Sequence, residues 1–220
     1  MQTAMHADFA QPVNYTVQQL GGDNAQQVAG TVAMMRRYVA DDCRNETFVH
    51  WLNGKLPQFA GGDYDPCEIA FRLARECFYF QRDETTGGPL ASDVVEVLVR
   101  PVDAVLLAQN GQKVPGDCDC FSMLVAAILR CFGVTCCFAT VAASPANPEA
   151  YSHVYVVANP GTEERVAVDA SHGKYCGWEA PNLGKYTEWP VDGVMGGSQA
   201  VVILLLLVAA FAYVKYGGGN

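Results

Sequence analysis

One helical segment in the middle of the chain constrains the fold most. It follows Pro115 and Gly116, and apolar side chains recur in it at helical spacing, at Phe121, Leu124, Val125, Ile128, Leu129 and Phe132. This pattern predicts a helix with one apolar face, and Gly133 suits the position just beyond its last turn. Such a face has to be buried, so we expect the helix to pack on another layer.

Sequence patterns predict helices before this segment and strands after it. One helix is expected at about 24–41, capped by Asp23, and another at 64–82, with Asp65 as N-cap and Pro66 in its first turn. The expected strands are 94–99, 134–143, 152–158 and 165–169. Residues 1–22 are expected to be a loose lead-in and 109–116 a loop. The order predicts an α+β fold, with the central helix packed on an antiparallel sheet.

Composition narrows the class of protein. Half of the residues are hydrophobic and 17% are charged, which is typical of a globular chain. The net charge of -9 argues against nucleic acid as a partner, because an acidic surface repels phosphates. The first twelve residues lack the basic and apolar regions of a signal peptide, so we expect a reducing compartment and mostly free thiols among the nine cysteines.

The C-terminal stretch has a different composition. No residue from 193 to 214 is charged, and 200–214 is almost purely apolar. A spanning helix needs roughly 20 such residues. The alternative, a buried core helix, fits less well because the stretch is apolar on every face. We therefore predict a membrane anchor over residues 199–215, whose orientation is left open because Lys185 and Lys215 flank it on both sides.

The central helix also carries a candidate nucleophile. Cys118 lies at its start, preceded by Asp117 as a candidate N-cap. The free N–H groups and positive dipole end of a helix stabilise a thiolate and can later stabilise an oxyanion. The carboxylates of Asp117 and Asp119 oppose this by raising the thiol pKa, so a nearby imidazolium would be needed.

His153 is the expected partner of that thiol. It lies in one predicted strand and Asp169 lies in the next, with a turn at 159–162 between them. A hairpin symmetric about Gly161 would place His153 directly opposite Asp169 on one face of the sheet. The carboxylate could then hold the imidazole in one orientation and one tautomer.

These motifs resemble the transglutaminase-like superfamily of papain-like folds, and more narrowly the small transglutaminase-like proteins of bacteriophages and prophages. The matching residues are Gly116-Asp117-Cys118-Asp119, then His153 on a strand, then Val168-Asp169-Ala170, with earlier matches at 78–83 and 95–101. The resemblance covers about residues 71–171. It implies a papain-like core, a Cys118-His153-Asp169 triad and a second oxyanion donor, for which Gln109 and Asn110 are candidates.

Other residues near this site offer alternatives. Cys120 stands where the family usually has an acidic residue, so a second thiol lies close to Cys118. His172 could compete with His153 as the base, although its surroundings indicate a turn. Zinc ligation by Cys118 and Cys120 or by Cys136 and Cys137 is disfavoured, because neither pair has the usual spacing. The aromatic residues between 175 and 189 could either wall a substrate cleft or pack beneath a loop.

The sequence therefore predicts three regions: a helical extension at 1–60, a transglutaminase-like domain at 61–192 and a membrane anchor at 193–220. The expected function is thiol-dependent acyl chemistry on a protein or peptide amide, as a cysteine peptidase, amidase or transglutaminase encoded by a phage or bacterium. No metal or organic cofactor is needed for it. The alternative is a non-catalytic phage structural or assembly protein that uses the fold as a binding scaffold. Substrate, acyl acceptor and oligomeric state are left open.

Overall fold

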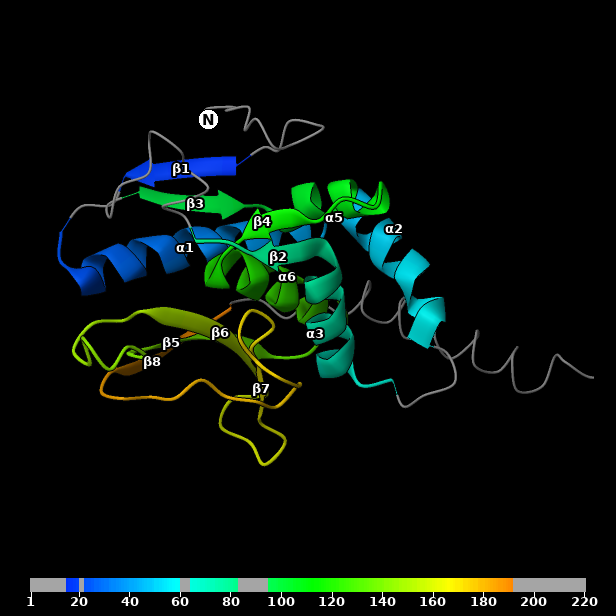
Figure 1. Cartoon of the computed structure of the whole chain (residues 1–220). Helices are drawn as coiled ribbons and strands as arrows, with labels where there is room; N and C mark the ends of the chain where they lie inside the picture. The colour runs from blue at the N-terminus through cyan, green and yellow to red at the C-terminus, as the bar shows by residue number, and fades with distance from the viewer. Residues whose placement is uncertain (1–14, 20–21, 60–63, 83–94, 192–220) are drawn as a thin grey trace, which may run out of the picture.

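Helix α6 (Cys118–Cys131) lies at the centre of the fold (Figure 1). The computed structural model describes residues 15–19, 22–59, 64–82 and 95–191. Every residue of α6 except Cys118 is buried. Helices α1, α3 and α5 pack on it from one side, and strands β5 and β6 cover it from the other. The predicted α+β class and the packing of this helix on an antiparallel sheet are confirmed.

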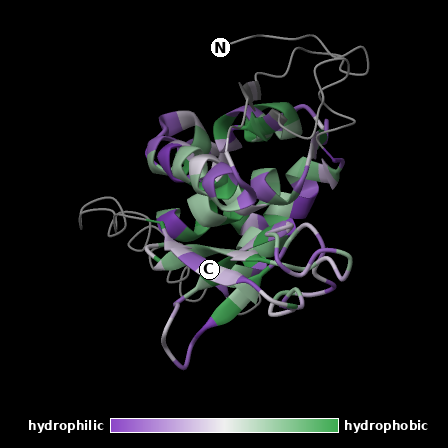
Figure 2. Cartoon of the chain, turned by 90° about the vertical axis from the view of Figure 1, so that its left-hand side faces the viewer, coloured by the Kyte–Doolittle hydropathy of each residue, from purple (hydrophilic) through white to green (hydrophobic). Residues whose placement is uncertain are grey.

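The other helices are α1 (Asn24–Asp42), α2 (Glu46–Lys55), the 3-10 helix η1 (Leu56–Phe59), α3 (Pro66–Cys77) and α5 (Pro101–Gln109). Strands β5 (Cys136–Val141), β6 (His153–Ala158), β7 (Val166–Val168) and β8 (Tyr186–Pro190) form an antiparallel sheet in the order β7-β6-β5-β8. Two small sheets pair β1 (Tyr15–Gln19) with β3 (Val95–Val99) antiparallel and β2 (Phe78–Phe80) with β4 (Val114–Gly116) parallel. Hydrophobic stretches gather where the helices meet the sheet, and hydrophilic stretches lie on the outer side of the helical layer (Figure 2).

Local capping explains where three helices begin or end. Asp23 and Gln26 form a reciprocal capping box at the start of α1. Asp65 accepts from the Cys67 N–H at 2.9 Å, with Pro66 in the first turn of α3. Helix α6 ends in a Schellman motif, in which Gly133 has φ 75° and the Val134 N–H donates to Leu129. These three features agree with the sequence patterns.

Four expectations about the elements were wrong. The helix expected over 64–82 ends at Cys77, because Phe78–Phe80 pairs with β4 instead. The expected loop at 109–116 contains strand β4. No helix was expected directly after the strand at 94–99, but Pro101 begins α5, where the missing N–H of a proline costs nothing. The expected lead-in includes strand β1, which pairs with β3 far along the chain.

The predicted membrane anchor at 193–220 lies outside the described residues. Among the residues that the structure does describe, none of the helices combines the length and apolarity needed to cross a bilayer.

Candidate active site

Cys118 is the first residue of α6, and Asp117 precedes it as an N-cap residue in extended conformation. Asp117 therefore occupies the predicted N-cap position, although its side chain makes no capping hydrogen bond. The backbone at Gly116 runs so close to the helix that a Cβ there would lie 2.8 Å from the Cys120 Cβ and 2.9 Å from the Phe78 ring. Glycine is therefore what allows β4 to deliver the chain to the start of α6.

Cys118 lines a cavity of about 810 Å³ between the helical layer and one end of the sheet. Helix α1 forms one wall, so the N-terminal region takes part in the site. The amide of Asn24 fixes this wall, because it donates to the Tyr151 carbonyl at 3.2 Å and accepts from the Tyr151 N–H at 2.8 Å. Other lining residues include Thr31, Met35, Phe80, Glu96, His153, His172 and Trp178.

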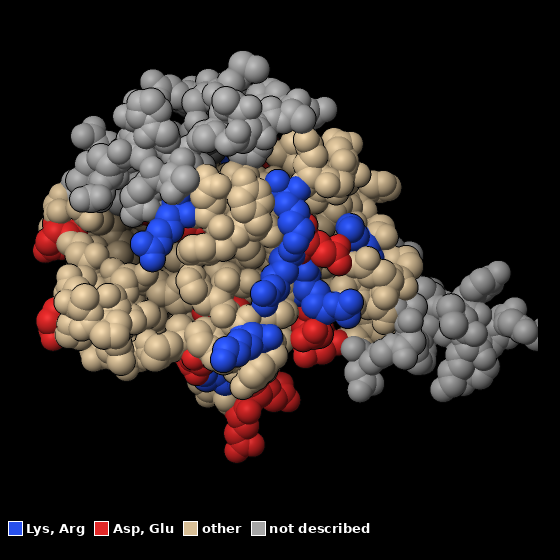
Figure 3. All heavy atoms as spheres, viewed as in Figure 1, with Lys and Arg blue, Asp and Glu red and all other residues tan. Residues whose placement is uncertain are grey.

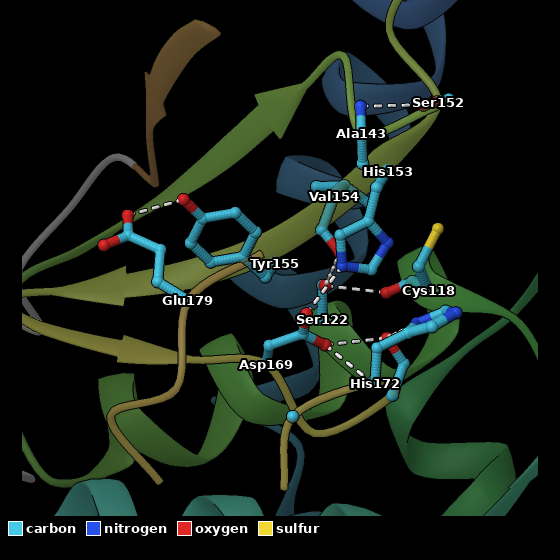
Figure 4. Close-up of polar contacts among 12 residues, drawn as sticks. Cys118, Ser122, Ala143, Ser152, His153, Val154, Tyr155, Asp169, His172 and Glu179 are labelled. Carbon is cyan, nitrogen blue, oxygen red and sulfur yellow. Dashed lines mark hydrogen bonds and ion pairs between the residues drawn. The ribbon is translucent and has the colours of Figure 1, made fainter. Parts of the chain in front are cut away.

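His153 and Asp169 form a buried hydrogen-bonded pair. The His153 Nε2 atom lies 2.7 Å from the Asp169 Oδ2 atom, and their side chains are 7% and 0% exposed. Because Nε2 is occupied by the carboxylate, the Nδ1 nitrogen is the one left for another partner. In Figure 4 the Cys118 sulfur lies to the side of the His153 ring that faces away from Asp169.

The register behind this pair differs from the expected one. Val156 pairs with Val168, so the hairpin is centred on Thr162 rather than Gly161. His153 and Asp169 are consequently offset by two positions instead of lying directly opposite each other. A shift of two residues keeps both side chains on one face of the sheet, whereas a shift of one would have separated them.

The Asp169 carboxylate is held by the turn that follows it. Its Oδ1 atom accepts from the Ser171 hydroxyl at 2.9 Å and from the His172 backbone N–H at 3.0 Å. Gly173 closes the turn by donating to the Asp169 carbonyl at 2.8 Å. A Cβ on Gly173 would lie 2.3 Å from that carbonyl oxygen, so the turn requires glycine.

Helix α3 braces the same turn. The Arg75 guanidinium donates to the Gly173 carbonyl at 2.8 Å, and Lys113 donates to the Arg75 carbonyl at 2.9 Å. On the face shown in Figure 3, Lys and Arg side chains gather over the region of α3. Arg75 and Lys113 therefore act as structural links between the helical layer and the Asp169 turn.

These contacts also set the charge of Asp169. Burial alone would raise its pKa, but the hydrogen bond and charge of His153 lower it. The Ser171 hydroxyl and the His172 N–H act in the same direction, and the net pKa lies below the ordinary value. Asp169 is therefore ionised at neutral pH and acts as an acceptor only.

The Cys118 thiol has the opposite balance. Burial raises its pKa well above the ordinary value, and the charge of Asp117 adds to the rise. Glu96 and Asp169 act in the same direction, while the Val154 backbone N–H opposes them. The resting thiol is therefore protonated, and the thiolate that the helix start was expected to favour is not the ground state.

Ser122 joins the start of α6 to the strand that carries His153. Its hydroxyl lies 2.6 Å from the Cys118 carbonyl oxygen and 3.2 Å from the Val154 carbonyl oxygen. This contact fixes the distance between the helix start and β6. The sequence signal was a serine one helical turn after Cys118, and it was missed, as was the polar Ser171 two residues after Asp169.

Of the alternative thiol, base and oxyanion donors that the sequence suggested for the site, only the base lines the cavity. The Cys120 thiol is buried and accepts from the Val99 N–H at 3.3 Å, so it belongs to the contact with β3. Gln109 and Asn110 lie at the end of α5 and do not line the cavity, which contradicts their candidacy as oxyanion donors. His172 does line it, with its ring centroid 4.7 Å from that of His153.

The two tryptophans of the aromatic stretch lie in different places. Trp178 lines the cavity, as a cleft wall would. Trp189 instead lies in β8 and donates from Nε1 to Thr140 Oγ1 at 2.9 Å, which is a packing role within the sheet.

The sequence was compared with known proteins, and it matches no protein-family model and no curated protein.

Proposed function

We propose that this protein carries out thiol-dependent acyl chemistry on an amide, with Cys118 as nucleophile, His153 as base and Asp169 as orienting carboxylate. The observation that carries this proposal is the 2.7 Å hydrogen bond from a cavity-lining His153 to an Asp169 whose other oxygen has two further donors. A carboxylate held in this way fixes the imidazole, which is what general-base catalysis requires. The resemblance to transglutaminase-like proteins agrees with this assignment.

The reaction starts from the neutral thiol. The Cys118 sulfur attacks the amide carbonyl carbon while its proton moves to the free Nδ1 of His153. The resulting oxyanion is stabilised by the backbone N–H of Cys118 at the start of α6. His153 then protonates the leaving amine as the C–N bond breaks, which leaves a thioester on Cys118.

The second half-reaction repeats these steps in reverse. An acceptor, either water or a primary amine, loses a proton to His153 and attacks the thioester carbonyl. The C–S bond breaks, and the sulfur regains the proton from His153. Water as acceptor gives a peptidase or amidase, and a lysine amine gives a crosslinking transglutaminase. A protein or peptide substrate and tethering to a membrane through residues 199–215 remain part of the proposal on the strength of the sequence.

A non-catalytic binding scaffold is the second candidate, and the raised pKa of the Cys118 thiol is the observation that favours it. In that case the cavity would hold a partner segment without turnover, and Cys118 would be a structural cysteine. A protonated thiol is also compatible with catalysis, provided that the base acts during the attack and not before it.

The test uses two matched variants, Cys118→Ala and Cys120→Ala, which remove thiols two residues apart. The purified protein is offered a glutamine-containing protein with a fluorescent primary amine, and a set of peptides, and we measure amine incorporation, ammonia release and cleavage. Loss of turnover in Cys118→Ala alone, together with a thioester on Cys118 by mass spectrometry, supports the proposal. Turnover that survives in Cys118→Ala refutes it. Absence of turnover in the unaltered protein, with equal partner binding by both variants, supports the scaffold.

A further inference from the structure

His172 extends the buried pair into a cluster of three metal-binding groups. His153, Asp169 and His172 each offer one ligand atom, and these atoms all lie within 4.8 Å of one another. The His172 ring stands edge-on to the His153 ring, with an interplanar angle of 78° (Figure 4). His172 is exposed, and both imidazoles line the cavity. The cluster is therefore accessible to a small ion in solution.

We propose that this cluster binds a divalent transition-metal ion such as Zn²⁺, and that the bound ion switches the site off. Two imidazoles and a carboxylate form a ligand set that zinc uses in enzymes, with bonds of about 2.0–2.2 Å. In the tetrahedral geometry that zinc prefers, such bonds place two ligand atoms about 3.3–3.6 Å apart. To admit the ion, the 2.7 Å contact between His153 Nε2 and Asp169 Oδ2 would have to open. The exposed His172 ring, whose Nδ1 is bonded to the Ser171 hydroxyl at 3.0 Å, would have to move toward that pair.

The surroundings of the cluster also suit a cation. The Asp169 Oδ1 atom is held by Ser171 and the His172 N–H, and such outer hydrogen bonds are usual for metal ligands. Oδ2, which contacts His153, is the atom that would bind the ion. The carboxyl groups of Glu96 and Asp117 line the same cavity, and Arg82 is the basic residue that opposes them there.

Metal binding would disable the base through its tautomer. An ion between His153 and Asp169 takes the Nε2 lone pair, so the imidazole proton has to reside on Nδ1. Nδ1 is the nitrogen that faces the thiol side, and a protonated Nδ1 cannot accept the Cys118 proton. This consequence rests on the proposed function, whereas the binding itself does not.

The binding test uses the full chain and ZnCl2, with CaCl2 as a control ion because calcium prefers oxygen ligands. Calorimetry compares the unaltered protein with His172→Ala and with His50→Ala, a matched variant of an exposed histidine on α2. We expect one Zn²⁺ per chain in the unaltered protein and in His50→Ala. The zinc affinity should fall by more than about 10-fold in His172→Ala, because even the loss of a hydrogen-bond partner of a metal ligand lowers metal affinity by about 10–100-fold. Equal zinc affinity in His172→Ala and His50→Ala would overturn the site, and circular dichroism checks that both variants fold.

The inhibition test measures turnover against Zn²⁺ concentration, each variant being normalised to its own metal-free rate. Loss of turnover at the concentration that fills the His172-dependent site, reversed by a chelator, supports the switch. Full occupancy without loss of turnover overturns it. A protein that shows no turnover but binds zinc in a His172-dependent way would leave the metal site supported and count against the proposed function instead.

Discussion

Replacing Asp169 by asparagine tests the orientation of the base most directly. The Oδ1 position receives hydrogen bonds from Ser171 and from the His172 N–H, so an amide NH2 placed there would meet two donors. Each unpaired donor would cost about 1–3 kcal/mol. The amide oxygen therefore takes the Oδ1 position, and the NH2 group takes the Oδ2 position beside His153 Nε2. That nitrogen must then accept a hydrogen bond, which places the imidazole proton on Nδ1.

A base with its proton on Nδ1 cannot take the proton of Cys118. We therefore expect Asp169→Asn to lower kcat by about 10⁴-fold, the scale of a wrong-tautomer base in a catalytic triad. This corresponds to about 5 kcal/mol of transition-state stabilisation. Turnover would be the assay, and nitrogen-15 NMR of His153 would report the tautomer. Glu163→Gln, an exposed carboxylate-to-amide change in the preceding turn, is the matched control. A folded Asp169→Asn that keeps more than about a tenth of the activity would refute the orienting role.

Four further predictions concern individual residues of the site and of the surrounding fold. Ser171→Ala should lower kcat by roughly 10-fold, because it removes the Ser171 hydrogen bond to the Asp169 carboxylate while that of the His172 N–H remains. A hydrogen bond to a charged group contributes about 1.5–3 kcal/mol. An unchanged kcat would exclude a positioning role for Ser171. Gly173→Ala should lower the free energy of unfolding in urea by about 1–3 kcal/mol, because the added Cβ would lie 2.3 Å from the Asp169 carbonyl oxygen. Gly54→Ala on α2, where a Cβ would meet open space, is the control and should be neutral or stabilising. Alkylation of Cys118 should keep accelerating above pH 9.0, and Asp117→Asn should speed it at fixed pH by lowering the thiol pKa; a plateau below pH 9.0 would contradict this. The hydrogen bond and charge of Arg165 lower the pKa of Glu179, burial raises it, and the net pKa is lowered. The stability that Glu179 contributes is therefore present above its ordinary pKa of 4.5 and is lost as the pH falls through the folded pKa. Glu179→Gln should flatten that loss in acid unfolding curves.

The sequence predicted those parts of the fold that local chemistry determines. The apolar face from Phe121 to Phe132, the cap at Asp65 and the glycine at 133 depend on residues close in the chain, and each has the expected structure. Strands that pair over long separations were missed, because β1 and β4 depend on partners that no local pattern identifies. Phe78 is an example: helical spacing continues through it, but its burial against β4 outweighs its helical propensity.

The site was predictable in its residue types but not in its electrostatics. The periodicity of two along strands was enough to bring His153 and Asp169 together, even though the centre of the hairpin was misplaced by one residue. The state of the thiol depends instead on burial and on charges from separate elements, such as Glu96 on β3, whose proximity to Cys118 only the tertiary structure reveals.

The proposed nucleophile and base lie in different layers of the fold, which pack together where α6 meets β6. Cys118 is part of the helical layer through the buried body of α6, whereas His153 begins β6 and Asp169 follows β7 in the sheet. Ser122 links the two at the Val154 carbonyl, and Asn24 links α1 to Tyr151, two residues before His153. Because these links flank His153 on both sides, they hold the imidazole at a fixed separation from the start of α6. The positions of Cys118 and His153 therefore do not depend on an ion pair between them, and in the proposed reaction the Cys118 proton needs to move only when a carbonyl carbon is present to receive the sulfur.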